Sequence, residues 1–264
     1  MPRVSFAYAD RAAIVAPPGT LRGEVESRAL FNRVTDPIHL HLHRMTPGAE
    51  LRLSGSPTDC LIYVWEGSID ATGTALIQRS SAIVERGAHL SVTGGSSGAA
   101  FLVFNMRERR ADDRSGGHVH LLPSACVPRV NNAGGRLIGM ALHADSRCPT
   151  CRVWLHENDF PTANEETTVH SHSEDEIIFV RAGAIRLGNR LYGPGTALAI
   201  AARTKYGFHS GPDGLSFVNF RGQSPTYTSG DGSVILDEAE LWRTTVGKPE
   251  YLTPARSPDA SWHD

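Results

Sequence analysis

Apolar residues occur along this chain in short runs that alternate with polar turns, which is the pattern of β-strands that have at least one buried face. The clearest runs are 60–64, 99–104, 177–180 and 215–220. Helical periodicity is nearly missing, although Asp237 with Glu240 three residues later forms a capping-box pattern and predicts a short helix over 237–243. The pattern therefore predicts an all-β fold with little helix.

The chain also repeats itself. The segment Cys60–Gly67 is similar to the segment Glu176–Gly183, at an offset of 116 residues, and Gly-containing turns lead into apolar strands at matching places after both. A chain of 264 residues is long enough for two average domains. We therefore expect domains over 1–134 and 135–264, with a linker that ends near Gly134.

The second copy carries the strongest candidate chemistry. His170 and His172 are one residue apart, so a strand presents both side chains on the same face. Glu176 follows across a tight turn and can point back at the same spot. Two imidazoles and one carboxylate are a ligand set that suits non-haem iron, and it is also compatible with manganese, nickel or zinc.

This motif resembles the first motif of the cupin superfamily, and His170, His172, Glu176 and Gly183 match its positions. The resemblance implies two tandem cupin barrels, also called double-stranded β-helices or jelly rolls, of the RmlC-like kind. In the first copy, Cys60 falls where Glu176 stands in the second. Serines fall where the two histidines stand, so the first barrel is expected to be degenerate, without metal ligands.

The resemblance also implies a fourth ligand, usually histidine, at the position that Tyr206 occupies here. Tyr206 could bind the metal as a phenolate, act as an acid or base whose pKa the cation lowers, or simply fill the barrel mouth. His209 could reach the metal if its loop bends. We therefore predict His170, His172, Glu176 and Tyr206 as metal ligands, with Tyr206 and His209 as candidate catalytic residues.

Three protein ligands would leave positions of a divalent ion (Fe, Zn, Ni or Mn) open for a substrate. The leading hypothesis is a metal-dependent enzyme, either dioxygenase-like or a Lewis-acid lyase, isomerase or decarboxylase, acting on a small oxygenated or carboxylate metabolite. The alternative is a non-catalytic cupin that binds or senses a small molecule.

Charge and composition narrow the partners. With 26 basic and 28 acidic residues the net charge is −2, which does not favour a nucleic-acid partner. The chain has no apolar run long enough to cross a bilayer and no apolar core of a signal peptide at its start, so we expect a cytoplasmic protein without a membrane partner. Exposed sheet edges need covering, and a homodimer is therefore expected.

Other histidines are interpreted as structural. His39, His41 and His43 alternate with two leucines and are expected on an exposed polar face. His118 and His120 form a similar pair without a carboxylate close by in the sequence.

The four cysteines do not form a disulfide framework. Cys148 and Cys151 are expected as reduced thiols in a turn, with a labile disulfide as the alternative. The first 28 residues show no strong period, so strands are expected to begin at Ala29.

Overall fold

The computed structural model describes residues 4–55, 57–107, 116–130, 139–245 and 251. The chain forms two compact units. The C-terminal unit comprises residues 1–11, 128–147 and 153–248, and the N-terminal unit comprises 12–127, 148–152 and 249–264. The predicted linker end at 134–135, most of the charged stretch 107–117 and the tail from Lys248, except Tyr251, lie outside the described residues.

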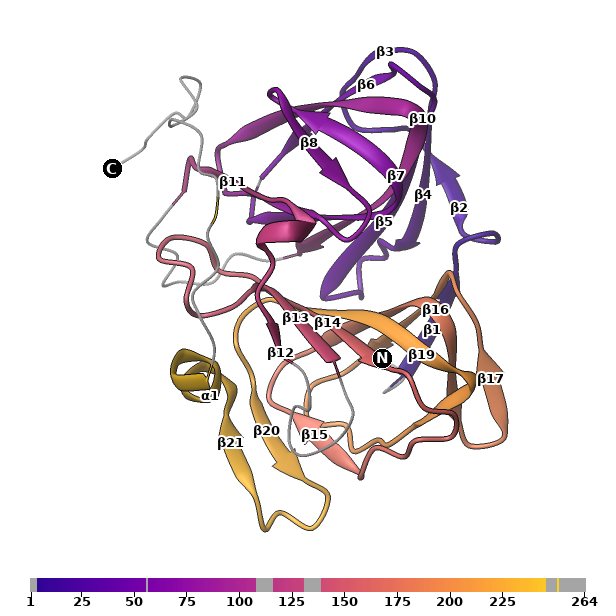
Figure 1. Cartoon of the computed structure of the whole chain (residues 1–264), viewed down its shortest axis with the longest axis vertical. Coiled ribbons are helices and arrows are strands. Elements are labelled where there is room, and N and C mark those ends of the chain that lie inside the picture. Colours follow the sequence, from indigo (N-terminus) through magenta and orange to yellow (C-terminus); the bar gives the residue numbers. More distant parts are fainter. Residues whose placement is uncertain (1–3, 56, 108–115, 131–138, 246–250, 252–264) are drawn as a thin grey trace. The chain divides into compact units, whose positions relative to one another are not determined.

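The strands of the C-terminal unit are β1 (Val4–Tyr8), β12 (Arg129–Val130), β13 (Gly139–Ala144), β14 (Trp154–Phe160), β15 (His170–His172), β16 (Glu176–Leu187), β17 (Arg190–Tyr192), β18 (Thr196–Ile200), β19 (His209–Arg221), β20 (Thr226–Ser229) and β21 (Ile235–Asp237). One sheet has the order β1-β18-β16-β19-β14-β13-β12, with β17 on β16, and a second has the order β15-β20-β21. Helix α1 (Glu238–Thr245) follows directly on β21 (Figure 1).

The strands of the N-terminal unit are β2 (Ala13–Val15), β3 (Thr20–Arg22), β4 (Val25–Phe31), β5 (Ile38–Met45), β6 (Glu50–Ser54), β7 (Cys60–Ala71), β8 (Thr74–Ile77), β9 (Ser81–Val84), β10 (His89–Met106) and β11 (Val119–Leu122), followed by a short 3-10 helix at Ser124–Cys126. The main path of its sheet is β11-β9-β7-β10-β5-β4-β2. The predicted all-β class with little helix is confirmed.

The first strand differs from the sequence prediction. Strand β1 pairs antiparallel with β18, from Val4 opposite Ile200 to Tyr8 opposite Thr196, and Figure 1 shows it in indigo among the orange strands of the C-terminal unit. The predicted domains are 1–134 and 135–264. Among the described residues, 4–11 and 128–130 instead belong to the C-terminal unit, and 148–152 and Tyr251 belong to the N-terminal unit. The expected start of the strands at Ala29 is wrong, since β1 to β3 precede it; two of these three strands are only three residues long, too short to show a clear period.

Strand pairing repeats between the units at the offset of 116 residues. Cys60 lies opposite Asn105 on β10, and Glu176 lies opposite Arg221 on β19. Gly67 and Gly183 both adopt positive φ, and a Cβ there would lie 2.2 Å and 2.3 Å from a carbonyl oxygen of the neighbouring strand. Both glycines are therefore required by the same close approach of two backbones.

A packed apolar core holds the C-terminal strands in place. Its buried members are Phe160, Ile178, Val180, Ile185, Leu198, Ile200, Phe208, Leu215 and Phe217, and Tyr206 packs against them. These side chains alternate along β16, β18 and β19, so the residues between them point to the opposite face. This core fixes the strands that carry the candidate site.

Candidate functional site

Four of the predicted site residues come together in the C-terminal unit. His170 and His172 are the two ends of β15, and Tyr206, in the loop before β19, exchanges two backbone hydrogen bonds of 2.9 Å with His170. The ring centroid of His170 lies 5.1 Å from that of His172 and 4.6 Å from that of Tyr206. Glu176, the first residue of β16, approaches them through its contact with Tyr206.

The Glu176 carboxylate is occupied on both oxygens. The hydroxyl of Tyr206 donates a short hydrogen bond to Oε1, and Nη2 of Arg221 lies 2.5 Å from Oε2. Burial alone would raise the pKa of Glu176, but the charge of Arg221, the charge of His172 and the Tyr206 hydrogen bond outweigh burial and lower it. Glu176 is therefore an ionised carboxylate that is already paired.

Tyr206 keeps its proton. Burial of the hydroxyl and the charge of Glu176 raise its pKa well above the ordinary value, and Arg221 offsets only part of this. The expected lowering of the Tyr206 pKa by a bound metal ion stays a prediction. Tyr206 is a hydrogen-bond donor to Glu176 and a potential acid.

Arg221 is a site residue that the sequence did not reveal. Its side chain is 1% exposed, and its guanidinium carbon lies 4.4 Å from the ring centroid of Trp154, within cation–π distance. Its Nε and Nη1 are buried and make no hydrogen bond to any described residue. A buried guanidinium with unmatched donors is costly unless another acceptor satisfies them.

Glu238 is the second such residue. The predicted helix is present as α1, and Asp237 caps it by accepting a hydrogen bond of 2.8 Å from the backbone N–H of Ala239. This places Oε1 of Glu238 3.2 Å from Nδ1 of His172. Burial raises the pKa of Glu238, but His172 and Arg221 outweigh it and lower the pKa to about 2.

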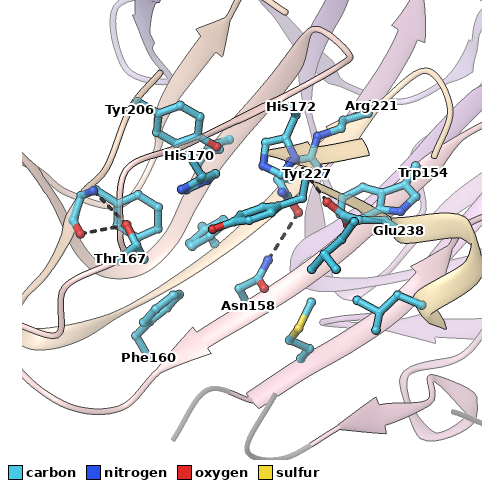
Figure 2. Close-up of a pocket in the computed structure, with 17 residues that line it drawn as sticks. Trp154, Asn158, Phe160, Thr167, His170, His172, Tyr206, Arg221, Tyr227 and Glu238 are labelled. Atoms are coloured by element: carbon cyan, nitrogen blue, oxygen red, sulfur yellow. Dashed lines mark hydrogen bonds and ion pairs between the residues drawn. The ribbon is translucent and has the colours of Figure 1, made fainter. Parts of the chain in front are cut away.

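A cavity of about 250 Å³ lies against this cluster. Figure 2 shows the residues around it, with the polar groups of His170, His172, Arg221 and Glu238 on one side. Aromatic and aliphatic side chains form most of the remaining wall, namely Met140, Trp154, Phe160, Ile178, Phe208, Phe217, Tyr227, Leu236 and Leu241. An apolar cavity with a few convergent polar groups is typical of a small-molecule site.

His209 does not lie with the other candidates. It begins β19 with a side chain that is 42% exposed, its Nε2 is 3.9 Å from Oε2 of Glu166, and it is not part of the cavity wall. In the regular strand geometry that starts at His209, the side chain faces away from the cluster.

The cluster as arranged does not fit a divalent metal. Among the described residues, no three His, Cys, Asp or Glu side chains are placed to share one ion. The contacts of Glu176 explain this. Tyr206 donates a hydrogen bond to one carboxylate oxygen, and the buried, positively charged guanidinium of Arg221 contacts the other. The metal set His170, His172, Glu176 and Tyr206 stays a prediction.

The histidines of the N-terminal unit differ from their interpretation. Leu40 and Leu42 are buried as expected, but the opposite face is not exposed: His39, His41 and His43 contribute to the wall of a cavity in that unit. Burial lowers the pKa of His43 to about 3, and its Nδ1 lies 2.6 Å from the Ser27 hydroxyl. The expectation of a solvated polar face is therefore wrong.

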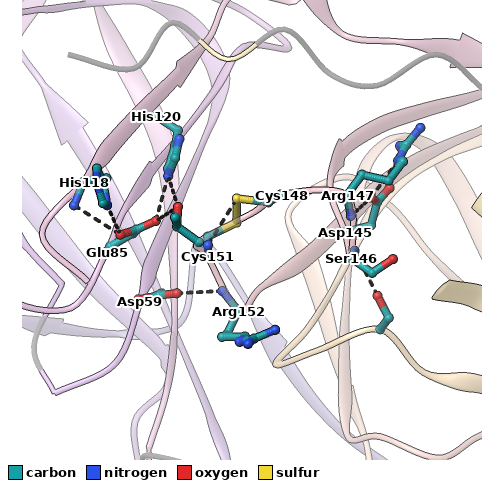
Figure 3. Close-up of a disulfide and its surroundings, with 12 residues drawn as sticks. Asp59, Glu85, His118, His120, Asp145, Ser146, Arg147, Cys148, Cys151 and Arg152 are labelled. Carbon is teal, nitrogen blue, oxygen red and sulfur yellow. Dashed lines mark hydrogen bonds and ion pairs between the residues drawn. A yellow bond between two sulfur atoms is a disulfide. The ribbon is translucent and has the colours of Figure 1, made fainter. Parts of the chain in front are cut away.

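His118 and His120 do have a carboxylate partner, which sequence distance concealed. Glu85 accepts from Nδ1 of His118 at 2.9 Å and from Nε2 of His120 at 2.7 Å. Figure 3 shows this cluster beside a disulfide between Cys148 and Cys151, so the expected reduced pair is not found. The hydroxyl of Thr150, between the two cysteines, also donates to Glu85.

Comparison with solved structures gives the class of fold. The protein YlbA from E. coli, family model DUF861, has a TM-score of 0.65 at 12% identity, over 83% of this chain and 90% of that one. A candidate dioxygenase from Nostoc punctiforme has a TM-score of 0.64 at 13% identity, over 90% and 87% of the two chains. The oxalate decarboxylase OxdC of Bacillus subtilis has a TM-score of 0.63 at 12% identity, over 86% and 79%.

These neighbours are cupin-type proteins, and the likeness shows that this chain has a cupin-type jelly-roll fold. Another similar solved structure is of the Bacillus subtilis oxalate decarboxylase and concerns the Mn(II) centres of that enzyme. No family model matches this chain, and neither does any curated protein. Of the helices in the described part of the chain, none has the length and apolar character needed to span a bilayer.

Proposed function

We propose that the C-terminal unit is an enzyme that removes a proton from the carbon beside a carbonyl or carboxylate group of a small molecule. The reaction would be of the isomerase or lyase type, in which a C–H bond beside the carbonyl or carboxylate is broken. The single observation that carries this proposal is that Arg221, whose buried Nε and Nη1 have no hydrogen-bond partner among the described residues, belongs to the wall of an apolar cavity. Carbonyl and carboxylate oxygens are acceptors for these donors, and a buried guanidinium stabilises the negative charge that develops on them.

The neighbouring residues fit the roles of base and acid. Glu238, with Oε1 3.2 Å from Nδ1 of His172, would place a negative charge beside this imidazole, and Nε2 of His172 would be left for the bound molecule. Nε2 would remove the proton, and the electron pair of the broken C–H bond would move to the oxygen held by Arg221. Tyr206 keeps its proton and, with a ring centroid 6.4 Å from that of His172, is the candidate donor.

The cavity also suggests the form of the substrate. Its wall combines aromatic and aliphatic side chains, and Tyr227 stacks on His170 with ring centroids 5.2 Å apart. The predicted small oxygenated or carboxylate metabolite would therefore carry an apolar or aromatic body, with its oxygens toward Arg221.

Deuterium incorporation tests this proposal. A panel of 2-oxo acids and related carbonyl compounds with apolar side chains is incubated in D₂O with a chelator, and exchange at the carbon beside the carbonyl is followed by NMR. His172→Gln and Tyr206→Phe should each lower the exchange rate by roughly a hundredfold or more. Binding of these compounds without exchange would favour the non-catalytic binding or sensing protein instead.

A metal-dependent enzyme, dioxygenase-like or of the Lewis-acid type, is the second candidate. One observation favours it: Nδ1 of His170 donates 2.7 Å to the carbonyl of Thr168, and this orientation leaves Nε2 free, as in metal-bound histidines. Iron, zinc, nickel and manganese are the ions to consider. Under this alternative, the chelator abolishes turnover, and adding one of these ions restores it.

A further inference from the structure

The pairing of β16 with β19 sets Arg221 opposite Glu176 at the level of the backbone. Directly paired residues on one face of a sheet have Cβ atoms close together, so the two side chains meet without a loop rearrangement. The next strand of the sheet sets Trp154 on the other side of Arg221. The position of the guanidinium is therefore fixed by three consecutive strands of one sheet.

In this position the Arg221 guanidinium contacts both Glu176 and Trp154. Nη2 of Arg221 is 2.5 Å from Oε2 of Glu176, and the two side chains are 1% and 2% exposed. Trp154 is within cation–π distance of the guanidinium, and Tyr206 takes the remaining oxygen of Glu176. A pair this deeply buried is screened little by solvent, so it holds strongly once it has formed.

A divalent ion between His170, His172 and Glu176 would need at least one Glu176 oxygen. Each oxygen already has one partner, Tyr206 or Arg221, and the ion would lie beside a buried positive charge that is not exposed to water. Repulsion between like charges in a low-dielectric interior opposes this strongly.

We infer that Arg221 is an internal cation that takes the place of a metal ion at Glu176, so the site accepts a divalent metal only when Arg221 is replaced. Glu176, the charged residue of the metal motif, is thus present, but it pairs with the Arg221 side chain instead of a metal ion. This deepens the proposed function, since a metal-independent reaction in this cavity needs a positive charge of its own. The inference is tested by metal uptake, so failure of the deuterium experiment does not decide it.

The test uses the full chain, stripped of metal and titrated with Mn(II), with bound metal followed by the loss of the free-ion EPR signal. Arg221→Met removes the charge but keeps a long side chain against Trp154, and it should bind about one Mn(II) per chain. The wild-type chain and Arg221→Lys, which retains the charge, should bind none at this site. Adding Glu176→Gln to Arg221→Met should abolish the uptake.

A matched control comes from the other unit. Asn105 lies opposite Cys60 at the position that corresponds to Arg221, so Asn105→Met should leave Mn(II) binding at the wild-type level. Circular dichroism checks that each variant is folded, and Arg221→Gln replaces Arg221→Met if the latter is not. Stoichiometric Mn(II) binding by the wild-type chain that Glu176→Gln abolishes would overturn the inference. Failure of both folded, uncharged Arg221 variants to bind Mn(II) would overturn it as well.

Discussion

The two units place different chemistry at the same pair of sheet positions. In the C-terminal unit, Glu176 and Arg221 form a buried ion pair, whereas in the N-terminal unit Cys60 and Asn105 lie opposite each other. Burial raises the pKa of the Cys60 thiol to about 12, so that pair is uncharged. The same strand register can therefore hold a charged pair or a neutral one, and the difference lies in the side chains alone.

The largest effect is expected from breaking the charged pair. Glu176→Gln leaves Arg221 buried without its counter-charge and should lower the free energy of unfolding by about 3–5 kcal/mol. Cys60→Ser at the matching position removes no charge and should cost less. Urea unfolding of both variants compares the costs, and equal losses would mean that the charge of Glu176 contributes nothing special.

Transplanting the neutral pair sharpens the comparison. Glu176→Cys combined with Arg221→Asn removes both charges together, so the double variant should be more stable than the sum of the single losses predicts, by at least about 1 kcal/mol. The coupling is read from urea unfolding of the two single variants and the double variant. Additive losses would show that the two side chains do not interact energetically.

The N-terminal unit should instead respond to pH through His43. The pKa of this imidazole is lowered to about 3, mainly by burial, while in the unfolded chain it is about 6.5. Between these values the unfolded chain binds a proton that the folded chain does not, so stability falls as pH decreases from about 6.5 toward 3, by up to about 1.4 kcal/mol per pH unit. His43→Gln should flatten this slope in thermal melts, and an unchanged slope would exclude His43 as its source.

The smallest effect is expected at the start of α1. Asp237→Ala removes the cap on the backbone N–H of Ala239 and should cost about 0.5–2 kcal/mol of helix stability. Glu238, the next residue, contacts His172, so loosening the helix start should also lower the rate of deuterium exchange under the proposed function. Asp231→Ala, in the exposed turn between β20 and β21, is the control for a change that does not touch α1.

Part of this site follows from sequence and part does not. The period of two along a strand is sufficient to place His170 and His172 together, and the spacing to Glu176 belongs to the same motif. Arg221 is 45 residues beyond Glu176, and only the register of two long strands brings them into contact. The motif therefore predicts which residues gather but not which cation they face.

The same limit applies elsewhere in the chain. The capping pattern at Asp237 predicts the helix but not that Glu238 reaches His172. The alternation of His39, His41 and His43 places them on one face correctly, yet burial of that face depends on the strands that close the unit. Local periodicity determines on which face of a strand a side chain lies, whereas its burial and its charge partner depend on distant segments.

The most direct test of the central claim is a crystal structure of the wild-type chain grown with excess Mn(II), with anomalous differences measured for manganese. The account predicts no anomalous peak between His170, His172 and Glu176, and density for Arg221 in contact with Glu176. A strong peak bonded to Glu176, with Arg221 turned away from it, would contradict the account.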